Sequence, residues 1–252
     1  TGTLDPFAQG VLPVCIGKAT RLIEYMNCEK EYLATVQFGA STTTFDIEGE
    51  ILNPLKKEQI VVTEKDIIEA LKIFQGEIEQ IPPIYSAIKV NGKKLYEYAR
   101  KGQTVEIKPR KVFIEKIELK EFNPDNLQAK ILIKCSQGTY IRSVANDLGK
   151  ILKTGAYLTE LIRTQSGKFR IESSVDLENV NLTSDLLNPL EFLDLPIIKV
   201  DNEDLTKIKN GMPLKNNQNN LAGNVILVYN DCEICAVATF QDNLIKLKKV
   251  FI

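Results

Sequence analysis

The chain has 252 residues, of which 44% are hydrophobic and 26% are charged, and its formal net charge is −1. This is the composition of an ordinary soluble globular protein, and the length suffices for one large domain and one small domain. We expect no membrane-spanning helix, because no run reaches the roughly eighteen apolar residues that such a helix needs. No secretory signal is visible, so we expect a cytoplasmic protein.

The charged residues are unevenly distributed, although the net charge does not itself indicate nucleic-acid binding. Residues 89–120 contain ten Lys or Arg and four Glu, a local balance of +6, and the other segments therefore sum to −7. Such a segment is either a solvated face or a basic patch that can attract a polyanion.

The cysteines are five in number and scattered, which argues against a disulfide framework. Cys232 and Cys235 form a C-x-x-C pair. Zinc usually requires four Cys or His ligands, and the sequence contains no histidine and no second C-x-x-C pair. We therefore expect a hairpin with two incidental thiols and no metal site.

The first 22 residues, TGTLDPFAQGVLPVCIGKATRL, are rich in turn formers, with Asp5 at their centre. Residues 11–16 form an apolar run that predicts a short buried strand broken by Pro13, and residues 18–26 look helical. Asp5 would then lie on a tight loop beside a buried element, where scaffolds present reactive groups. The alternative is that Asp5-Pro6 merely opens a turn.

Hydrophobic periodicity predicts the elements that follow. Residues 30–39 alternate as a strand, residues 40–49 form a polar loop, and residues 63–74 form a helix that Thr63 caps. Asn91-Gly92 predicts a hairpin turn. Residues 112–122 and 127–135 resemble an antiparallel pair of strands, and a helix begins near Ile141. Beyond residue 196, an Asn-rich loop at 216–220 and three short apolar runs predict a small β-rich unit.

Several motifs resemble the TruB family, which makes pseudouridine at position 55 in the T loop of tRNA. They occur in family order over about residues 1–174. They are G-T-L-D-P with G-V-L-P and G-x-A-T, then Y-x-A-x-x-x-F-G with T-x-T-x-D-x-x-G, then P-P-x-Y-S-A-x-K, then G-T-Y-I-R-S-x-x-x-D-L-G, and finally G-A-x-L-x-x-L-x-R-T-x-x-G-x-F. A weaker match after residue 196 resembles the entry to a PUA-related RNA-binding barrel.

The resemblance implies an α+β protein with the pseudouridine synthase fold, a mixed, mainly antiparallel sheet with flanking helices, plus a small C-terminal PUA-like β-barrel domain. It implies a catalytic domain at 1–195, with a thumb-like RNA-binding insertion at 76–105, and the PUA-like domain at 196–252. The implied activity is that of an RNA-modifying isomerase, a tRNA pseudouridine synthase acting on uridine 55.

The resemblance also assigns the site. Asp5 is implied as the essential carboxylate, Tyr32 as the residue that stacks on the extruded base, and Tyr140 and Arg142 as its partners in catalysis. A guanidinium beside Asp5 would keep the desolvated carboxylate ionised and oriented. The expected substrate contacts are Leu161 beneath the base and, in the thumb-like insertion, Tyr85, Lys89, Lys93 and Lys94.

The expected partner is the T arm of tRNA, bound by a monomer without a cofactor, a metal or a membrane. The family carries a histidine directly before the T-G-T-L-D run, and a strand and helix before that. If that segment is absent, a second hypothesis is a non-catalytic protein that binds tRNA and helps it fold. A third hypothesis is a fragment that is not stable alone.

Overall fold

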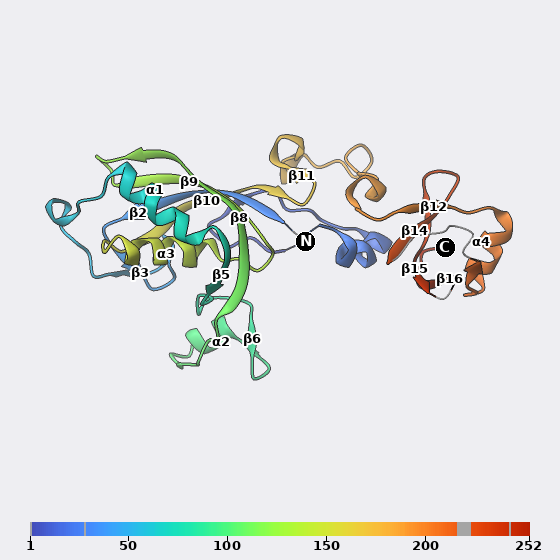
Figure 1. Cartoon of the computed structure of the whole chain (residues 1–252), viewed down its shortest axis with the longest axis horizontal. Helices are drawn as coiled ribbons and strands as arrows, with labels where there is room; N and C mark the ends of the chain where they lie inside the picture. The colour runs from blue at the N-terminus through green and yellow to red at the C-terminus, as the bar shows by residue number, and fades with distance from the viewer. Residues whose placement is uncertain (1, 28, 216–222, 242) are drawn as a thin grey trace. The chain divides into compact units, whose positions relative to one another are not determined.

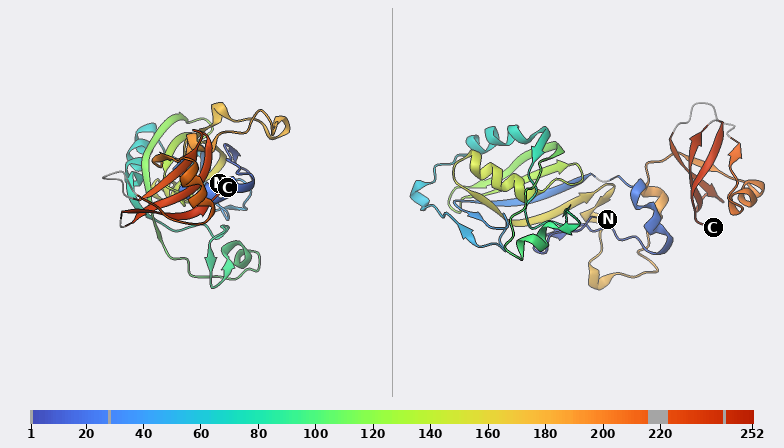
Figure 2. Two further views of the ribbon diagram at one scale, coloured as in Figure 1. Left: turned by 90° about the vertical axis from the view of Figure 1, so that its right-hand side faces the viewer. Right: turned by 90° about the horizontal axis from the view of Figure 1, so that it is seen from below.

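The structure, a computed structural model, describes residues 2–27, 29–215, 223–241 and 243–252. It comprises two compact units (Figures 1 and 2). The larger unit contains Gly2–Leu12 and Cys28–Ser174, and the smaller unit contains Pro13–Asn27 and Val175–Ile252. The domain boundary between residues 195 and 196 stays a prediction, and the Asn-rich loop predicted at 216–220 lies outside the described residues.

The larger unit is built on a seven-stranded sheet with the strand order β1-β10-β2-β9-β8-β5, in which β11 also pairs with β10. All its pairs are antiparallel except β1 with β10, which is parallel. The strands are β1 (Gln9–Gly10), β2 (Lys30–Phe38), β5 (Gly76–Gln80), β8 (Arg110–Asn123), β9 (Gln128–Cys135), β10 (Ala156–Ser166) and β11 (Phe169–Arg170). The expected mixed, mainly antiparallel sheet is confirmed.

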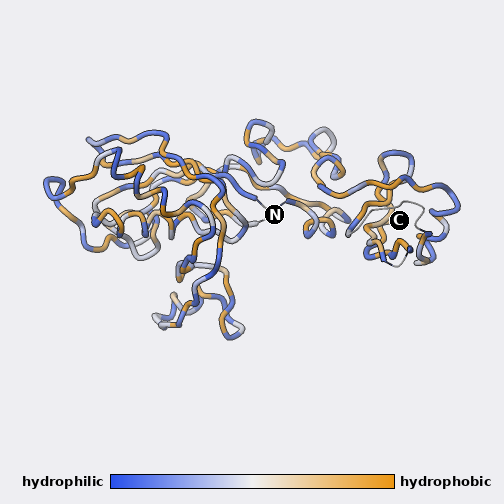
Figure 3. The backbone as a smooth tube through the Cα atoms, in the orientation of Figure 1, coloured by the Kyte–Doolittle hydropathy of each residue, from blue (hydrophilic) through white to orange (hydrophobic). Residues whose placement is uncertain are grey.

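Two amphipathic helices, α1 (Glu64–Leu71) and α3 (Ile141–Ile151), pack on one face of this sheet. Thr63 caps α1 through a reciprocal capping box with Asp66, as predicted. Apolar and polar residues alternate at short intervals along the chain (Figure 3), as expected for elements with one buried side. The core between helices and sheet includes Val36, Ile67, Ile114, Ile131, Ile133, Val144, Leu148 and Leu158.

Shorter elements complete the larger unit. Asn91 and Gly92 both have positive φ angles and turn the chain between β6 (Lys89–Val90) and β7 (Lys93–Lys94), so the predicted hairpin is confirmed. The helix α2 (Leu95–Ala99) follows that hairpin directly. The remaining pieces are β3 (Ser41–Thr42), β4 (Ile51–Leu52), η2 (Lys57–Gln59), η3 (Lys72–Phe74) and η4 (Ile171–Ser173), where η denotes a 3-10 helix.

The buried strand predicted for residues 11–16 is wrong. The strand here is the two-residue β1, which ends at Gly10, and the side chains of Leu12, Val14 and Ile16 are exposed. Pro13 lacks the N–H that a strand ladder needs, which is one reason pairing stops at this point. The helix predicted at 18–26 is present as the 3-10 helix η1 (Gly17–Tyr25).

The smaller unit has a five-stranded sheet with the order β12-β14-β15-β16-β13, parallel only between β12 and β14. Arg21 of η1 stacks over the ring of Phe251 and donates to the carbonyl of Val250 at 2.6 Å. η1 therefore packs on the sheet of this unit. The other elements are η5 (Leu177–Asn179), η6 (Pro189–Phe192), β12 (Ile197–Lys199), α4 (Asn202–Lys209), β13 (Leu214–Lys215), β14 (Asn224–Tyr229), β15 (Glu233–Gln241) and β16 (Leu244–Val250).

The sheet of the smaller unit curls around its own apolar core, which contains Ile208, Val225, Leu227, Ala236 and Ile245. Among the residues that the structure describes, no helix has the length and apolarity that a membrane crossing requires.

Substituting Leu148 tests the packing of α3 against the sheet. This side chain is fully buried, so Leu148→Ala should lower the free energy of unfolding by about 2–5 kcal/mol through lost apolar contact and a cavity. Urea unfolding followed by circular dichroism measures the change. Ile151→Ala, on the same helix but 40% exposed, is the matched control. Equal losses in both variants would contradict the packing described.

Candidate active site

Asp5 opens a tight turn at the edge of the larger sheet. The N–H of Ala8 donates to the carbonyl of Asp5 at 2.9 Å, and Pro6 supplies the fixed φ that suits the second position of a β-turn. Phe7 and Ala8 then pack against the main core. Because the residues after it are anchored, the carboxyl group of Asp5 is held where 31% of its side chain stays exposed.

Arg142 is the second residue of α3, and the end of β5 fixes the start of that helix. Gln80 donates to the Tyr140 carbonyl at 3.0 Å and accepts from the Tyr140 N–H at 2.7 Å. Ser143 donates its hydroxyl to the carbonyl of Ile81 at 2.9 Å. These bonds satisfy backbone groups at the helix start and hold the side chain of Arg142 in one direction.

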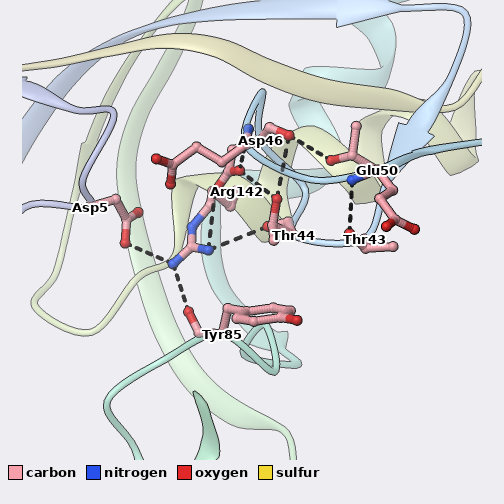
Figure 4. A network of polar contacts seen from close by, with 9 residues as sticks. Asp5, Thr43, Thr44, Asp46, Glu50, Tyr85 and Arg142 are labelled. Carbon is pink, nitrogen blue, oxygen red and sulfur yellow. Dashed lines mark hydrogen bonds and ion pairs between the residues drawn. The ribbon is translucent and has the colours of Figure 1, made fainter. Parts of the chain in front are cut away.

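The guanidinium of Arg142 lies between two carboxylates (Figure 4). Nη2 contacts Oδ1 of Asp5 at 2.7 Å, and Nη1 contacts Oδ2 of Asp46 at 3.3 Å. The carbonyls of Thr44 and Tyr85 accept further bonds at 3.3 and 3.0 Å. A buried cation at the positive end of a helix dipole is unfavourable, so two anionic partners are what this position requires.

Asp46 is almost fully buried, and its own loop holds it. Its Oδ1 accepts from the Thr44 hydroxyl at 2.5 Å and from the Glu48 N–H at 3.0 Å, while the Thr42 hydroxyl donates to its carbonyl at 2.7 Å. A Cβ on Gly49 would lie 2.4 Å from Oγ1 of Thr44, so only glycine fits there. The T-x-T-x-D-x-x-G motif therefore builds the loop that presents Asp46 to Arg142.

The pKa of Asp5 lies above its ordinary value. Burial raises this pKa most, the charge and hydrogen bond of Arg142 lower it, and the nearby Asp46 carboxylate raises it. Arg142 thus offsets only part of the desolvation. The structure brings Asp5 and Arg142 together as the sequence predicted, yet Asp5 keeps a higher proton affinity than an exposed aspartate.

Tyr32 and Leu161 lie on the core face of the sheet near this network. Tyr32 on β2 is paired across the strands with Arg163 on β10, and Ala34 with Leu161, so these four side chains share one face. Burial raises the pKa of Tyr32, and the adjacent thiol of Cys135 adds to the effect. Tyr32 therefore keeps its phenolic proton at neutral pH.

Two further candidates, Asp46 and Arg163, are not among the site residues predicted from the sequence. Asp46 belongs to a motif, but the surrounding residues read only as a polar loop. Arg163 is 1% exposed, and its guanidinium donates to backbone carbonyls of the segment that carries Asp5. Strand alternation places Arg163 on the same face as Leu161, but it does not predict the contacts of Arg163 with the Asp5 segment.

The remaining predicted residues are placed as follows. Tyr140 is the N-cap residue of α3 and contributes its backbone to the contacts with Gln80. Tyr85 accepts from Arg142 through its carbonyl, and its side chain is exposed. The lysines expected to bind RNA lie on the β6–β7 hairpin: Lys89, Lys93 and Lys94. The roles of all of these side chains stay predictions.

Cys232 and Cys235 are free thiols in the hairpin between β14 and β15, the first exposed and the second buried. Within the part of the chain that the structure describes, no group of three or more Cys, Asp or Glu side chains is arranged to hold a metal ion.

Family models identify the chain. Residues 1–141 match the TruB family pseudouridylate synthase N-terminal domain, and residues 142–191 match the tRNA pseudouridylate synthase B C-terminal domain. The chain belongs to the TruB family. Its relatives include proteins named tRNA pseudouridine synthase B. That of Carboxydothermus hydrogenoformans is 46% identical, covering 99% of this chain and 87% of the relative. That of Staphylococcus haemolyticus is 42% identical, covering 100% and 88%.

Solved structures establish the fold of this TruB-family chain as that of pseudouridine synthases. A Cbf5-Nop10-Gar1 complex matches with a TM-score of 0.65 at 23% identity, covering all of this chain and 75% of the matched chain. An H/ACA ribonucleoprotein bound to a substrate RNA containing 2′-deoxyuridine matches with a TM-score of 0.66 at 21% identity and the same coverages. The curled sheet of the smaller unit agrees with the expected PUA-like domain.

The raised pKa of Asp5 predicts how its removal changes stability. The folded chain holds the Asp5 proton more tightly than the unfolded chain, so stability falls as pH rises from the ordinary pKa of 3.8 through the raised value. Asp5→Asn cannot ionise. At neutral pH the Asp5→Asn variant should be at least as stable as the wild type. Any gain in its free energy of unfolding over the wild type should become smaller in acid.

Thermal unfolding at neutral and mildly acidic pH measures this effect. Asp125→Asn, in an exposed turn, is the control and should behave as the wild type. A clear loss of stability at neutral pH in Asp5→Asn alone would show that the ion pair with Arg142 outweighs the burial of the carboxylate.

Proposed function

We propose that this TruB-family enzyme isomerises uridine to pseudouridine at position 55 in the T loop of tRNA, with Asp5 as its catalytic carboxylate. The observation that carries the proposal is the partly exposed Asp5 carboxylate, held 2.7 Å from the buried guanidinium of Arg142. The names of its full-length relatives support the RNA-modifying activity. In this proposal residues 1–195 form the catalytic domain and residues 196–252 the PUA-like domain.

The target uridine must leave the base stack before a carboxylate can reach it, which costs a few kcal/mol of unstacking. In the proposal Tyr32 stacks on the extruded base and Leu161 packs beneath it. Tyr32 is suited to this role because it stays uncharged, and a neutral aromatic face stacks on a uracil without a charge to desolvate.

The reaction breaks the bond between N1 and C1′, turns the base and joins C5 to C1′. C5 then loses its proton and N1 takes one up, so the product is an isomer of the substrate. Asp5 initiates it in one of three ways, by attack on C6, by attack on C1′ or by removal of a proton from C2′. Each route uses an ionised Asp5 oxygen, and Arg142 holds the carboxylate in that form and in one orientation. Tyr140 serves as a proton carrier or hydrogen-bond donor. The chain's own side chains supply all of these groups.

Binding of the T arm is assigned to the thumb-like insertion at residues 76–105. Lys89 and Lys93 project from an exposed hairpin, and Lys94 and Arg100 both lie over the ring of Tyr96. Basic groups interleaved with aromatic rings suit phosphate contacts and base stacking. Tyr85 lies at the base of this insertion, where its carbonyl meets Arg142. The enzyme acts as a monomer in the cytoplasm.

Tritium release from a tRNA transcript that carries 5-tritiated uridine tests the proposed function, because forming pseudouridine expels the proton of C5. The wild type should release tritium, and Asp5→Asn should release none while binding tRNA normally. Release at position 55 is checked by changing that single uridine to cytidine in the transcript. Binding without release in the wild type would instead identify a non-catalytic tRNA-binding protein.

Asp46→Asn tests whether the second carboxylate orients Arg142. The substitution keeps the size of the side chain but removes the charge opposite Nη1, so we expect tritium release to slow by about 10- to 100-fold with tRNA binding retained. Asp147→Asn, on the exposed side of α3, is the control carboxylate and should leave the rate unchanged. A wild-type rate in Asp46→Asn would mean that Asp5 and the two carbonyls suffice to hold Arg142.

A further inference from the structure

Arg163 is buried at the point where the catalytic segment meets the sheet. Its Nε donates to the carbonyl of Val11 at 2.7 Å, and Nη2 donates to the carbonyl of Gly2 at 3.1 Å. These two carbonyls flank the segment that carries Asp5. One side chain therefore bridges the beginning and the end of the catalytic loop.

The backbone of Arg163 holds the same segment. Its carbonyl accepts from the Val11 N–H at 2.9 Å, and β1 pairs in parallel with β10 at Ile162 and Arg163. A Cβ on Gly10 would lie 2.2 Å from the Arg163 carbonyl oxygen. The loop thus approaches the strand so closely that only glycine fits, and its distance from β10 is determined by this contact.

The Arg163 guanidinium donates to two backbone carbonyls and forms a further hydrogen bond with the phenol of Tyr32, whereas Arg142 contacts two carboxylates. Burying a guanidinium on neutral acceptors costs free energy, so it is a poor way to stabilise a core. The guanidinium is, however, rigid and planar, with several N–H donors. It can therefore join two acceptors at a fixed separation, which a lysine ammonium cannot do in the same way.

We infer that Arg163 is a positioning residue for the reaction, which sets the place of Asp5 by holding both ends of the Gly2–Val11 segment. This inference rests on the proposed catalytic role of Asp5. Arg163 acts through the backbone of the loop. The charged neighbours that govern the proton affinity of Asp5 are Arg142 and Asp46. Loss of Arg163 should therefore misplace the carboxylate without changing the pH at which it ionises.

The test uses the full chain with Arg163→Lys, which keeps the charge, and Arg163→Met, which removes it. Single-turnover tritium release, tRNA binding and thermal unfolding are measured for each variant. Both variants should bind tRNA with near wild-type affinity and lose about 10²-fold in rate, since a displacement of about 1 Å can cost that much. The midpoint of the pH–rate profile should not move. Arg170→Met, an exposed arginine on the adjacent β11, is the matched control.

Gly10→Ala tests the contact between the loop and Arg163 from the loop side. It remains a test of the inference if the Arg163 variants do not fold. It should show the same loss of rate with binding retained. Three results for the Arg163 variants would overturn the inference. They are a near wild-type rate, a loss of tRNA affinity as large as the loss of rate, and a shifted midpoint of the pH–rate profile. Failure of all three variants to unfold cooperatively would also overturn it, since Arg163 would then be a requirement of the fold. Absence of tritium release in the wild type would instead refute the proposed function.

Discussion

The guanidinium of Arg142 is the group on which the arrangement of the site depends. It joins the turn of Asp5, the loop of Asp46 and the base of the residue 76–105 insertion, where it meets the Tyr85 carbonyl. A cation at the start of a helix needs such partners, because the helix dipole and the loss of water both oppose it. Segments that are more than 130 residues apart in the chain, Asp5 and Arg142, are thereby held in direct contact.

The environment of the Asp5 carboxylate combines two opposing effects on its pKa. Burial raises the pKa of Asp5, and Arg142 offsets part of that effect. The Asp5 carboxylate is therefore partly desolvated, yet it keeps an ionic partner and remains partly exposed. A carboxylate whose burial opposes its ionisation is a common feature of active sites.

Two buried arginines, Arg142 and Arg163, have different surroundings and, in our interpretation, different tasks. Arg142 contacts carboxylates and acts on charge, while Arg163 contacts carbonyls and acts on backbone position. Strand alternation alone would assign both Arg163 and Leu161 to the core. A buried arginine at a core-facing strand position indicates a structural requirement that strand propensity does not describe, which in our interpretation is the attachment of a loop.

The sequence by itself determined the elements with strong local signals, because their stability comes from neighbouring residues. These elements are the Thr63-capped helix, the Asn91-Gly92 hairpin, the β8–β9 pair and the helix from Ile141. The order of the motifs also identified the family and the fold, and it predicted the pairing of Asp5 with Arg142. The strand predicted at residues 11–16 does not form, because an apolar run does not show whether a partner strand is available. Only the tertiary structure showed that Asp46 contacts Arg142 and that Arg163 contacts the segment that carries Asp5. Their roles depend on contacts with Arg142 and with the Gly2 and Val11 carbonyls, and no local pattern encodes contacts between segments so far apart.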